Sequence, residues 1–209
     1  MLINITKSFL LVVFTLFTVA CSDNNTPELG KQYSVLPNDL SSLKLAPITE
    51  VFSLTCGHCR NMEASLPEIE SLTNQKIGKV HVTFNQSAQV SAMLYYAAVM
   101  QLDKQPDHDL MAALFEVVQQ QEGTMEQKQA RIEEVFVSRG LISPYNFDNS
   151  HVSDMEQHLT FADEVSRKAD INSVPSFIIN GKYLLISEGH KDIPDLAATI
   201  NYLLSKSES

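Results

Sequence analysis

The tetrapeptide Cys56-Gly57-His58-Cys59 stands one residue after the segment 48–54 (ITEVFSL), which is rich in β-branched and aromatic residues. Such a composition predicts a buried strand, because these side chains pack well on a pleated sheet. From Gly57 onward, apolar residues recur at every third or fourth position, which indicates a helix. Two cysteines separated by two residues, at the junction of a strand and a helix, can close a disulfide without distorting the fold. The motif therefore predicts a redox-active cysteine pair.

The expected position of the first cysteine favours its thiolate form. Cys56 would lie at the N-terminus of the helix, where unpaired amide N–H groups and the helix dipole stabilise negative charge. His58 adds to this effect if it donates a hydrogen bond or carries a positive charge. A stabilised thiolate is a good leaving group, so the disulfide becomes an oxidant of other dithiols. We predict that Cys56 is the exposed attacking sulfur and that Cys59, one turn later, is the buried resolving sulfur. Gly57 and His58 would tune the reduction potential.

Two less reactive interpretations of the cysteine pair are a structural disulfide and half of a zinc site. Zinc would require two further ligands, and the chain has no second cysteine pair. The other histidines are dispersed without ligand spacing, so we expect no metal and interpret each of them as a surface or capping residue. These histidines are His81, His108, His151, His158 and His190.

A long helical block follows the first strand and helix. Pro67 is expected to interrupt the helix after the cysteines, and residues 79–84 have the composition of a strand. Between residues 86 and 163 there is almost no strand signal, while the apolar spacing is repeatedly helical. The helices expected in this region are 90–102, 109–121, 125–137 and 151–168. The pattern predicts an all-helical unit inside an α/β chain.

The C-terminal part of the sequence has the pattern of strand, turn, strand and helix. Residues 176–179 and 183–186 are the expected strands. The dipeptide Asn180-Gly181 between them favours the positive φ angles of a two-residue hairpin turn. Residues 192–205 are expected to form the last helix.

A second motif, Val174-Pro175, opens the first of these C-terminal strands. A CxxC pair after a strand, an X-Pro at the start of a later strand and a closing hairpin with a helix resemble thioredoxin. Thioredoxin itself has no helical block of this size, and an inserted helical domain is the mark of DsbA-like proteins. The resemblance to the DsbA-like family extends from residue 30 to the last helix. It implies a thioredoxin fold with an inserted all-helical domain, in which residues 31–85 and 164–209 form the thioredoxin domain and residues 86–163 the insert.

The resemblance also implies roles for four further residues. In this family the proline at the position of Pro175 is cis, and its loop lies beside the active-site disulfide. The backbone of the preceding residue, here Val174, pairs with an extended substrate. Glu50 and Lys79 match a charged pair that the family buries beneath the resolving cysteine, where the pair could relay a proton. The alternative for Pro175 is an ordinary trans proline at the start of a strand. The alternative for Glu50 and Lys79 is a surface salt bridge or two unrelated charges.

The N-terminal residues resemble an export signal. Lys7 is the only charged residue among residues 1–20, and residues 9–20 are almost continuously apolar. This apolar run is too short for a bilayer, which needs about 20 residues, so we interpret residues 1–20 as a cleaved signal peptide. The resemblance and the signal peptide together imply a periplasmic protein.

Cys21 directly follows the signal segment and resembles a bacterial lipoprotein processing site, although Thr18 stands where such sites usually have leucine. An unpaired thiol is a liability beside a disulfide-exchanging pair unless it is acylated. We therefore expect Cys21 to carry a lipid and residues 21–30 to form a flexible tether that anchors the protein to a membrane. Ordinary cleavage after Ala20 is the alternative.

Composition and family resemblance together define the expected partners. The chain has 15 Lys and Arg against 25 Asp and Glu, a net charge of −10, and no basic run, so a nucleic-acid partner is not expected. The resemblance implies a monomer with no cofactor beyond its disulfide. It implies that this disulfide passes to reduced or unfolded exported proteins through a mixed disulfide, and that a membrane quinone-linked protein resembling DsbB restores it.

The dipeptide between the cysteines departs from the family pattern. DsbA most often has proline and histidine there, whereas Gly57 and His58 are typical of protein disulfide isomerase. The reduction potential is therefore expected between about −120 and −270 mV, the values of DsbA and thioredoxin. An isomerase or reductase is a second interpretation, although no separate dimerisation domain is expected here. A third is a non-catalytic chaperone-like module that holds unfolded chains on the apolar surface around Cys56 and Pro175.

Overall fold

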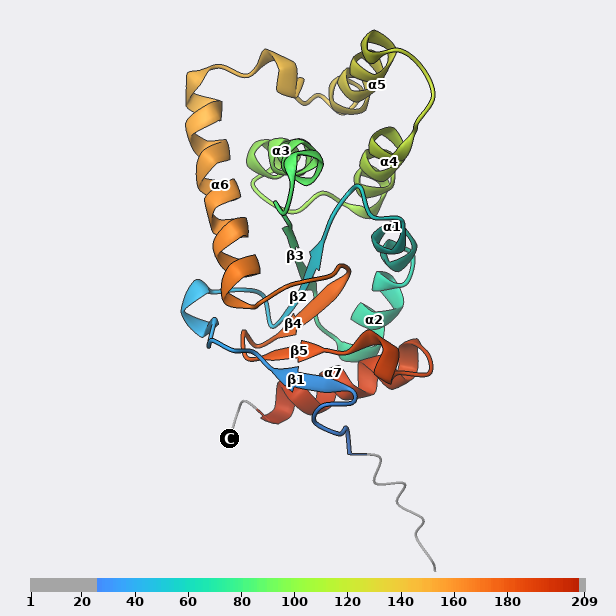
Figure 1. Cartoon of the computed structure of the whole chain (residues 1–209). Coiled ribbons are helices and arrows are strands. Elements are labelled where there is room, and N and C mark those ends of the chain that lie inside the picture. The colour runs from blue at the N-terminus through green and yellow to red at the C-terminus, as the bar shows by residue number, and fades with distance from the viewer. Residues whose placement is uncertain (1–25, 207–209) are drawn as a thin grey trace, which may run out of the picture.

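A five-stranded mixed sheet runs through the centre of the fold (Figure 1). The computed structural model describes residues 26–206, and the strand order is β1-β5-β4-β2-β3. Strands β2 and β3 are parallel, and the other neighbouring pairs are antiparallel. The strands are β1 (Tyr33–Val35), β2 (Ile48–Phe52), β3 (Ile77–His81), β4 (Ser176–Ile179) and β5 (Tyr183–Leu185). The expected α/β class is thus confirmed.

The strand predicted at residues 79–84 was placed too late, because β3 begins at Ile77 and ends at His81. Its partner β2 ends at Phe52, which pairs with His81. The N–H of Val82 still donates to the Phe52 carbonyl (2.9 Å), and beyond it the chain has no strand to follow. The short edge strand β1 was not predicted, since three residues carry too little pattern.

The helices follow the predicted order with small shifts of their ends. They are α1 (Gly57–Glu63), α2 (Leu66–Thr73), α3 (Gln86–Leu102), α4 (His108–Gln119), α5 (Met125–Val137), α6 (Asn149–Lys168) and α7 (Ile193–Lys206). Three short 3-10 helices lie in connecting segments, η1 (Ser41–Leu43), η2 (Pro144–Asn146) and η3 (Ser187–Gly189). Pro67 interrupts the helix as predicted, because it occupies the first turn of α2, where its missing N–H costs nothing.

The four long helices between β3 and β4 each begin at a side chain that accepts a hydrogen bond from a backbone N–H of the first turn. These N-cap residues are Asn85, Asp107, Thr124 and Asp148. A cap satisfies donors that the helix itself leaves unpaired, so the helix starts at the cap and not at its first apolar residue. This explains why α3 begins four residues before the apolar spacing that predicted it.

Helices cover both faces of the sheet (Figure 1). Helices α3 and α6 contact β3 on one side, while α2 and α7 pack together on the other. The side chains of β4 alternate accordingly: Ile178 belongs to the core shared with the inserted helices, and Phe177 and Ile179 belong to the core under α7. Helices α3, α4 and α5 lie at one end of the molecule, with α4 next to α1, and α6 runs from this end down along the sheet (Figure 1).

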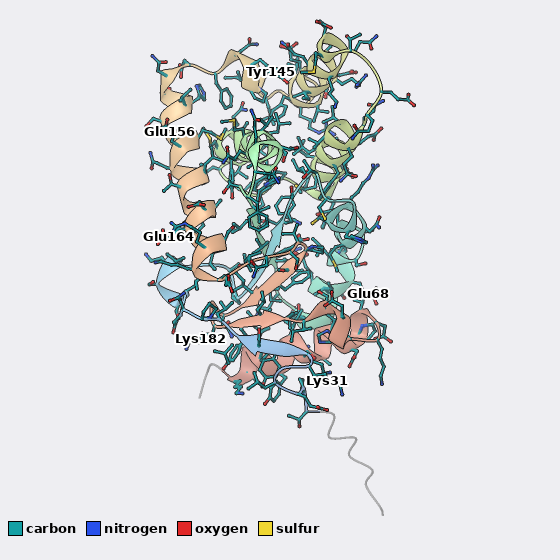
Figure 2. The ribbon with its side chains drawn as sticks, viewed as in Figure 1. Lys31, Glu68, Tyr145, Glu156, Glu164 and Lys182 are labelled. Atoms are coloured by element: carbon teal, nitrogen blue, oxygen red, sulfur yellow. The ribbon has the colours of Figure 1, made fainter. Side chains whose placement is uncertain are left out.

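Helix α6 shows how one inserted helix meets this core. Its residues Met155, Ala162 and Val165 are buried. Glu156 and Glu164 lie on the outer side of the same helix, as Figure 2 shows. The boundary that we expected between residues 163 and 164 lies within α6, which continues without a break from the end of the insert to the thioredoxin part.

The residues before β1 form a turn. The N–H of Gly30 donates to the Tyr33 carbonyl (2.8 Å), and the N–H of Gln32 donates to the Glu28 carbonyl (3.0 Å). Gly30 has a φ of +84°, which glycine adopts without steric cost. The last residues of the flexible tether expected over residues 21–30 therefore belong to this hydrogen-bonded turn.

The structure does not describe the segment that was expected to direct export and membrane attachment. The expected signal peptide (1–20) and the candidate lipidation site Cys21 lie outside residues 26–206. Within the described part of the chain, no helix combines the length and the apolar character needed to cross a membrane.

Candidate active site

The cysteine pair lies at the carboxyl end of strand β2, where the chain enters α1. Cys56 is the N-cap of α1, and its sulfur accepts a hydrogen bond from the N–H of Cys59 (3.3 Å). Both thiols are free in this structure. Cys56 is half-buried, whereas Cys59 is 0% exposed. The geometry thus presents one sulfur to solvent and keeps the other beneath it.

Two side chains from other elements hold the loop that carries Cys56. The Nε2 atom of His81, at the end of β3, accepts a hydrogen bond from the N–H of Leu54 (2.9 Å). Gln119, at the end of α4, donates from Nε2 to the carbonyls of Leu54 (2.9 Å) and Cys56 (3.1 Å). The loop is therefore tied both to the sheet and to the inserted helices.

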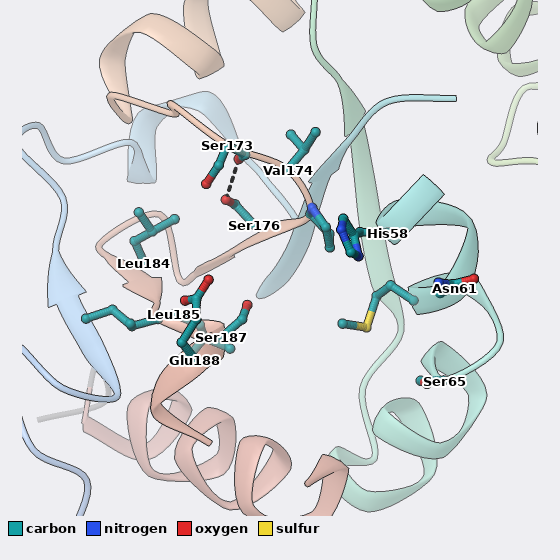
Figure 3. Close-up of a pocket in the computed structure, with 13 residues that line it drawn as sticks. His58, Asn61, Ser65, Ser173, Val174, Ser176, Leu184, Leu185, Ser187 and Glu188 are labelled. Atoms are coloured by element: carbon teal, nitrogen blue, oxygen red, sulfur yellow. Dashed lines mark hydrogen bonds between the residues drawn. The ribbon is translucent and has the colours of Figure 1, made fainter. Parts of the chain in front are cut away.

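The Val174–Pro175 peptide bond is cis, as the family resemblance implied, and the trans alternative is wrong. Its loop lies against the cysteine pair, because the thiol of Cys56 donates to the carbonyl of Val174 (3.4 Å). The hydroxyl of Ser176 donates to the carbonyl of Ser173 (2.7 Å) and closes the loop, as the dashed line in Figure 3 shows. Two motifs more than a hundred residues apart thus meet at the exposed sulfur.

A groove of about 650 Å³ opens beside this contact (Figure 3). One wall comes from α1 and the residues after it, and the other comes from the cis-proline loop, β5 and η3. The groove is mixed in character, with an imidazole at the cysteine end and a carboxylate at the far end. Its lining includes His58, Met62, Val174, Leu184, Ile186 and Glu188.

A buried network of charges lies beneath Cys59. Glu50 and Lys79 are register partners on the parallel strands β2 and β3 and form an ion pair. The Nζ atom of Lys79 also contacts Glu63 of α1 (2.8 Å), whose other carboxylate oxygen contacts Nδ1 of His108 on α4 (2.8 Å). The side chains of Lys79 and Glu50 are only 5% and 1% exposed, so the alternative of a surface salt bridge is wrong.

Burial and charge shift the titration of these groups. Burial raises the pKa of the Cys59 thiol well above its ordinary value, and the nearby Cys56 and Glu50 raise it further. Burial also raises the pKa of Glu50. Burial alone would lower the pKa of Lys79, but Glu50 and Glu63 together raise this pKa above its ordinary value. The site therefore favours a protonated Cys59 and a charged Lys79.

Three residues of this site were missed or misread from the sequence. Glu63 follows Cys59 by one helical turn, a spacing that could have revealed it. Gln119 carries no sequence signal of its role. His81 is 0% exposed, so its interpretation as a surface or capping residue is wrong; it is buried because β3 ends beneath the cysteine loop. Burial lowers its pKa to about 4.

Two of the remaining histidines contact groups outside this network. His151 contacts its helix cap Asp148 (2.7 Å), and the ring of His158 stacks on Tyr96 with centroids 5.2 Å apart. Among residues 26–206, no three His, Cys, Asp or Glu side chains are grouped as a metal site.

Comparison with known proteins places this site in a family. The sequence profile described as Thioredoxin matches residues 45–201, about three quarters of the chain. The chain belongs to the thioredoxin family. A curated relative is the thiol:disulfide interchange protein DsbA of Buchnera aphidicola subsp. Schizaphis graminum, which is 24% identical over 188 residues, with 86% of each chain covered.

Solved DsbA structures share the fold of this thioredoxin-family chain. DsbA from Pseudomonas aeruginosa superimposes with a TM-score of 0.64 at 19% identity, covering 87% of this chain and 95% of that one. DsbA from Proteus mirabilis gives a TM-score of 0.62 at 18% identity, covering 86% and 97%. The expected DsbA-like thioredoxin fold, with helices inserted between β3 and β4, is confirmed.

Proposed function

We propose that this chain is a thiol-disulfide oxidoreductase that donates the Cys56–Cys59 disulfide to exported proteins. The observation that carries the proposal is the position of Cys56, half-buried against the carbonyl of Val174 and directly above the buried Cys59. A structural disulfide would need neither an accessible sulfur nor a groove beside it.

The reaction proceeds through a mixed disulfide. A substrate thiolate attacks Sγ of Cys56, the bond to Cys59 breaks, and Cys59 leaves with the electron pair and takes up a proton. A second substrate thiolate then attacks the substrate sulfur, and Cys56 leaves as a thiolate. The substrate loses two electrons and the cysteine pair gains them.

The substrate lies along the cis-proline loop and the adjoining groove. The backbone of Val174 pairs with an extended substrate segment, and Pro175 keeps this backbone beside Cys56. A structure of the Proteus mirabilis DsbA contains a non-covalently bound peptide, PWATCDS, which supports a peptide substrate for this chain. We assign Gly57 and His58 to tuning of the reduction potential, and Glu50 with Lys79 to proton transfer at Cys59.

The protein acts in the periplasm as a monomer. The signal peptide at residues 1–20 directs export, and a lipid on Cys21 anchors the chain to a membrane through residues 21–30. Electrons gained from substrates pass to a membrane quinone-linked partner that resembles DsbB. We divide the mature chain into a thioredoxin domain (31–85 and 164–209) and a helical insert (86–163).

The decisive experiment is the equilibrium reduction potential of the Cys56–Cys59 pair against glutathione, measured on the mature chain carrying Cys21→Ser. A value towards about −120 mV supports an oxidase. A value near about −270 mV would make the chain a reductase or isomerase, the second candidate, which the Gly57-His58 dipeptide favours.

Two variants test the roles of the sulfurs. Cys59→Ser should accumulate a mixed disulfide when it is incubated with a disulfide-bonded peptide, because the Cys56 thiolate opens the peptide disulfide, one peptide sulfur leaves as a thiolate, and no resolving thiol remains. Mass spectrometry detects this species. Cys56→Ser should form none and should lose all oxidase activity. The chain would instead be a non-catalytic holding module if two results were found together. Wild type would show no oxidase activity, and Cys56→Ser would protect unfolded substrates from aggregation as fully as wild type does.

A further inference from the structure

When the disulfide opens, the buried sulfur of Cys59 must take up a proton. This inference rests on the proposed function, in which Cys59 is the leaving group at each turnover. Cys59 is 0% exposed, and burial raises the pKa of its thiol. The sulfur must therefore be protonated when the disulfide opens and deprotonated when it is restored, although water does not reach it directly.

A chain of buried charges leads from the surroundings of this sulfur to the surface. The charge of Glu50 acts on the Cys59 thiol, and Oε1 of Glu50 is buried without a hydrogen-bond partner. Lys79 bridges Glu50 and Glu63, and Glu63 in turn contacts Nδ1 of His108 (2.8 Å). The path thus joins four elements, β2, β3, α1 and α4.

Only the last group of this path reaches solvent. The side chain of His108 is 49% exposed, whereas Glu63, Lys79 and Glu50 are each less than one tenth exposed. Imidazole can take up and release protons near neutral pH, since its two nitrogens alternate between donor and acceptor. A histidine at the mouth of a buried chain of ionisable groups is therefore suited to exchange protons with water.

We propose that His108 is the solvent end of a proton relay that serves Cys59 through Glu63, Lys79 and Glu50. On disulfide opening, the Glu50 carboxylate takes a proton from the Lys79 ammonium and passes it to the Cys59 thiolate. His108 then gives a proton to the Glu63 carboxylate, Glu63 passes it to Lys79, and water reprotonates His108. Restoration of the disulfide runs the same transfers in reverse. His108 acts through these groups and touches no reacting atom.

The relay requires the helical insert. His108 is the first residue of α4, and α4 packs against α1, which carries Glu63. The charge of His108 also acts on Glu70 of α2, and Asp107 and Asp109 are the neighbours of His108 in the sequence. None of these three forms an ion pair with a group of the buried path, as far as residues 26–206 show.

The test compares His108→Gln and His108→Ala with wild type in the mature chain carrying Cys21→Ser. Glutamine can keep a hydrogen bond to Glu63 but cannot conduct a proton. Single-turnover oxidation of a dithiol peptide, quenched with acid and read by mass spectrometry, should slow about tenfold in both variants. This loss of rate is smaller than the 10²–10⁴-fold contribution of a direct general acid, because water can still deliver protons slowly to Glu63 in place of His108. The equilibrium between disulfide and dithiol should not move, since a relay speeds both directions equally.

Two measurements separate a relay from a structural contact. Added imidazole should restore the rate of His108→Ala, and it should not change the rate of the matched control His151→Gln, whose ion pair with Asp148 lies outside the path. A wild-type rate in His108→Gln, or a shifted equilibrium without a change of rate, would overturn the relay. Absence of oxidase activity in wild type would instead overturn the proposed function.

Discussion

At the scale of single residues, the buried Lys79 has an unusual position. Its ammonium is shared by two buried carboxylates, those of Glu50 and Glu63. A buried ion pair gives little net stability, but removal of one partner leaves an uncompensated charge in a medium that solvates it poorly. The stability of this site therefore depends on keeping all of its charges together.

We expect Lys79→Met to lower the free energy of unfolding by about 3–5 kcal/mol at pH 8, because two carboxylates then face each other without a cation. The loss should be smaller at pH 5, because burial raises the pKa of Glu50 and this carboxylate then takes up a proton more readily. Urea unfolding at both pH values measures the effect. An equal loss at pH 5 and pH 8 would contradict this explanation, and Glu50→Gln/Lys79→Met should recover part of the stability.

His81 is the second residue whose burial has a measurable consequence. Its folded-state pKa is about 4, against an ordinary value of 6.5. Between these values the unfolded chain binds a proton and the folded chain does not, so stability falls as the pH is lowered from 6.5 to 4. The loss is roughly 3 kcal/mol. In His81→Gln the unfolding free energy should change less over this range, and a profile as steep as wild type would assign the slope to other groups.

At the scale of elements, the end of α4 controls the loop between β2 and α1. Gln119 satisfies two carbonyls of this loop, those of Leu54 and Cys56. A carbonyl that loses its donor in a partly buried place is costly. The inserted helices thus hold the backbone that carries the exposed sulfur.

We expect Gln119→Leu to lower the free energy of unfolding by about 2 kcal/mol, since two carbonyls lose their donor. Hydrogen exchange of the amides of residues 55–58 should become faster in this variant. Gln75→Leu is the matched control, because Gln75 is exposed between α2 and β3. Unchanged exchange at residues 55–58 in Gln119→Leu would show that the loop does not need the side chain.

At the scale of the whole molecule, the sheet and the inserted helices share one hydrophobic core. The ring of Phe52 on β2 lies 5.1 Å from that of Tyr95 on α3 and 6.1 Å from that of Phe115 on α4. All three side chains are essentially inaccessible to solvent. Because the same contacts stabilise both parts, the insert and the thioredoxin part should unfold together.

We expect Phe115→Ala to lower the free energy of unfolding by about 3–5 kcal/mol, the cost of a large cavity. The loss of helical circular dichroism and the labelling of the buried Cys59 thiol should still follow one transition. Phe84→Ala, at a phenylalanine 49% exposed, should cost far less. An early loss of helix with Cys59 still protected would show that the insert unfolds separately.

Local patterns predicted most elements and half of the site. The C-terminal strand at residues 176–179, the helix at 125–137 and the turn at Asn180-Gly181 have the predicted limits, since each depends on nearest neighbours or a fixed period. The cysteine motif was visible for the same reason. Limits that depend on a distant partner, such as the end of β3, were misplaced.

The sequence by itself determined the chain's cysteine chemistry, its α/β character and the presence of a helical insert, because spacing and periodicity are local properties. The family resemblance added Glu50, Lys79 and the cis proline. Only the tertiary structure decided that Glu63 and His108 extend this pair and that His81 and Gln119 hold the cysteine loop. These contacts join residues 16 to 65 positions apart, and they exist only because packing in three dimensions excludes water and makes a buried polar group without a partner costly.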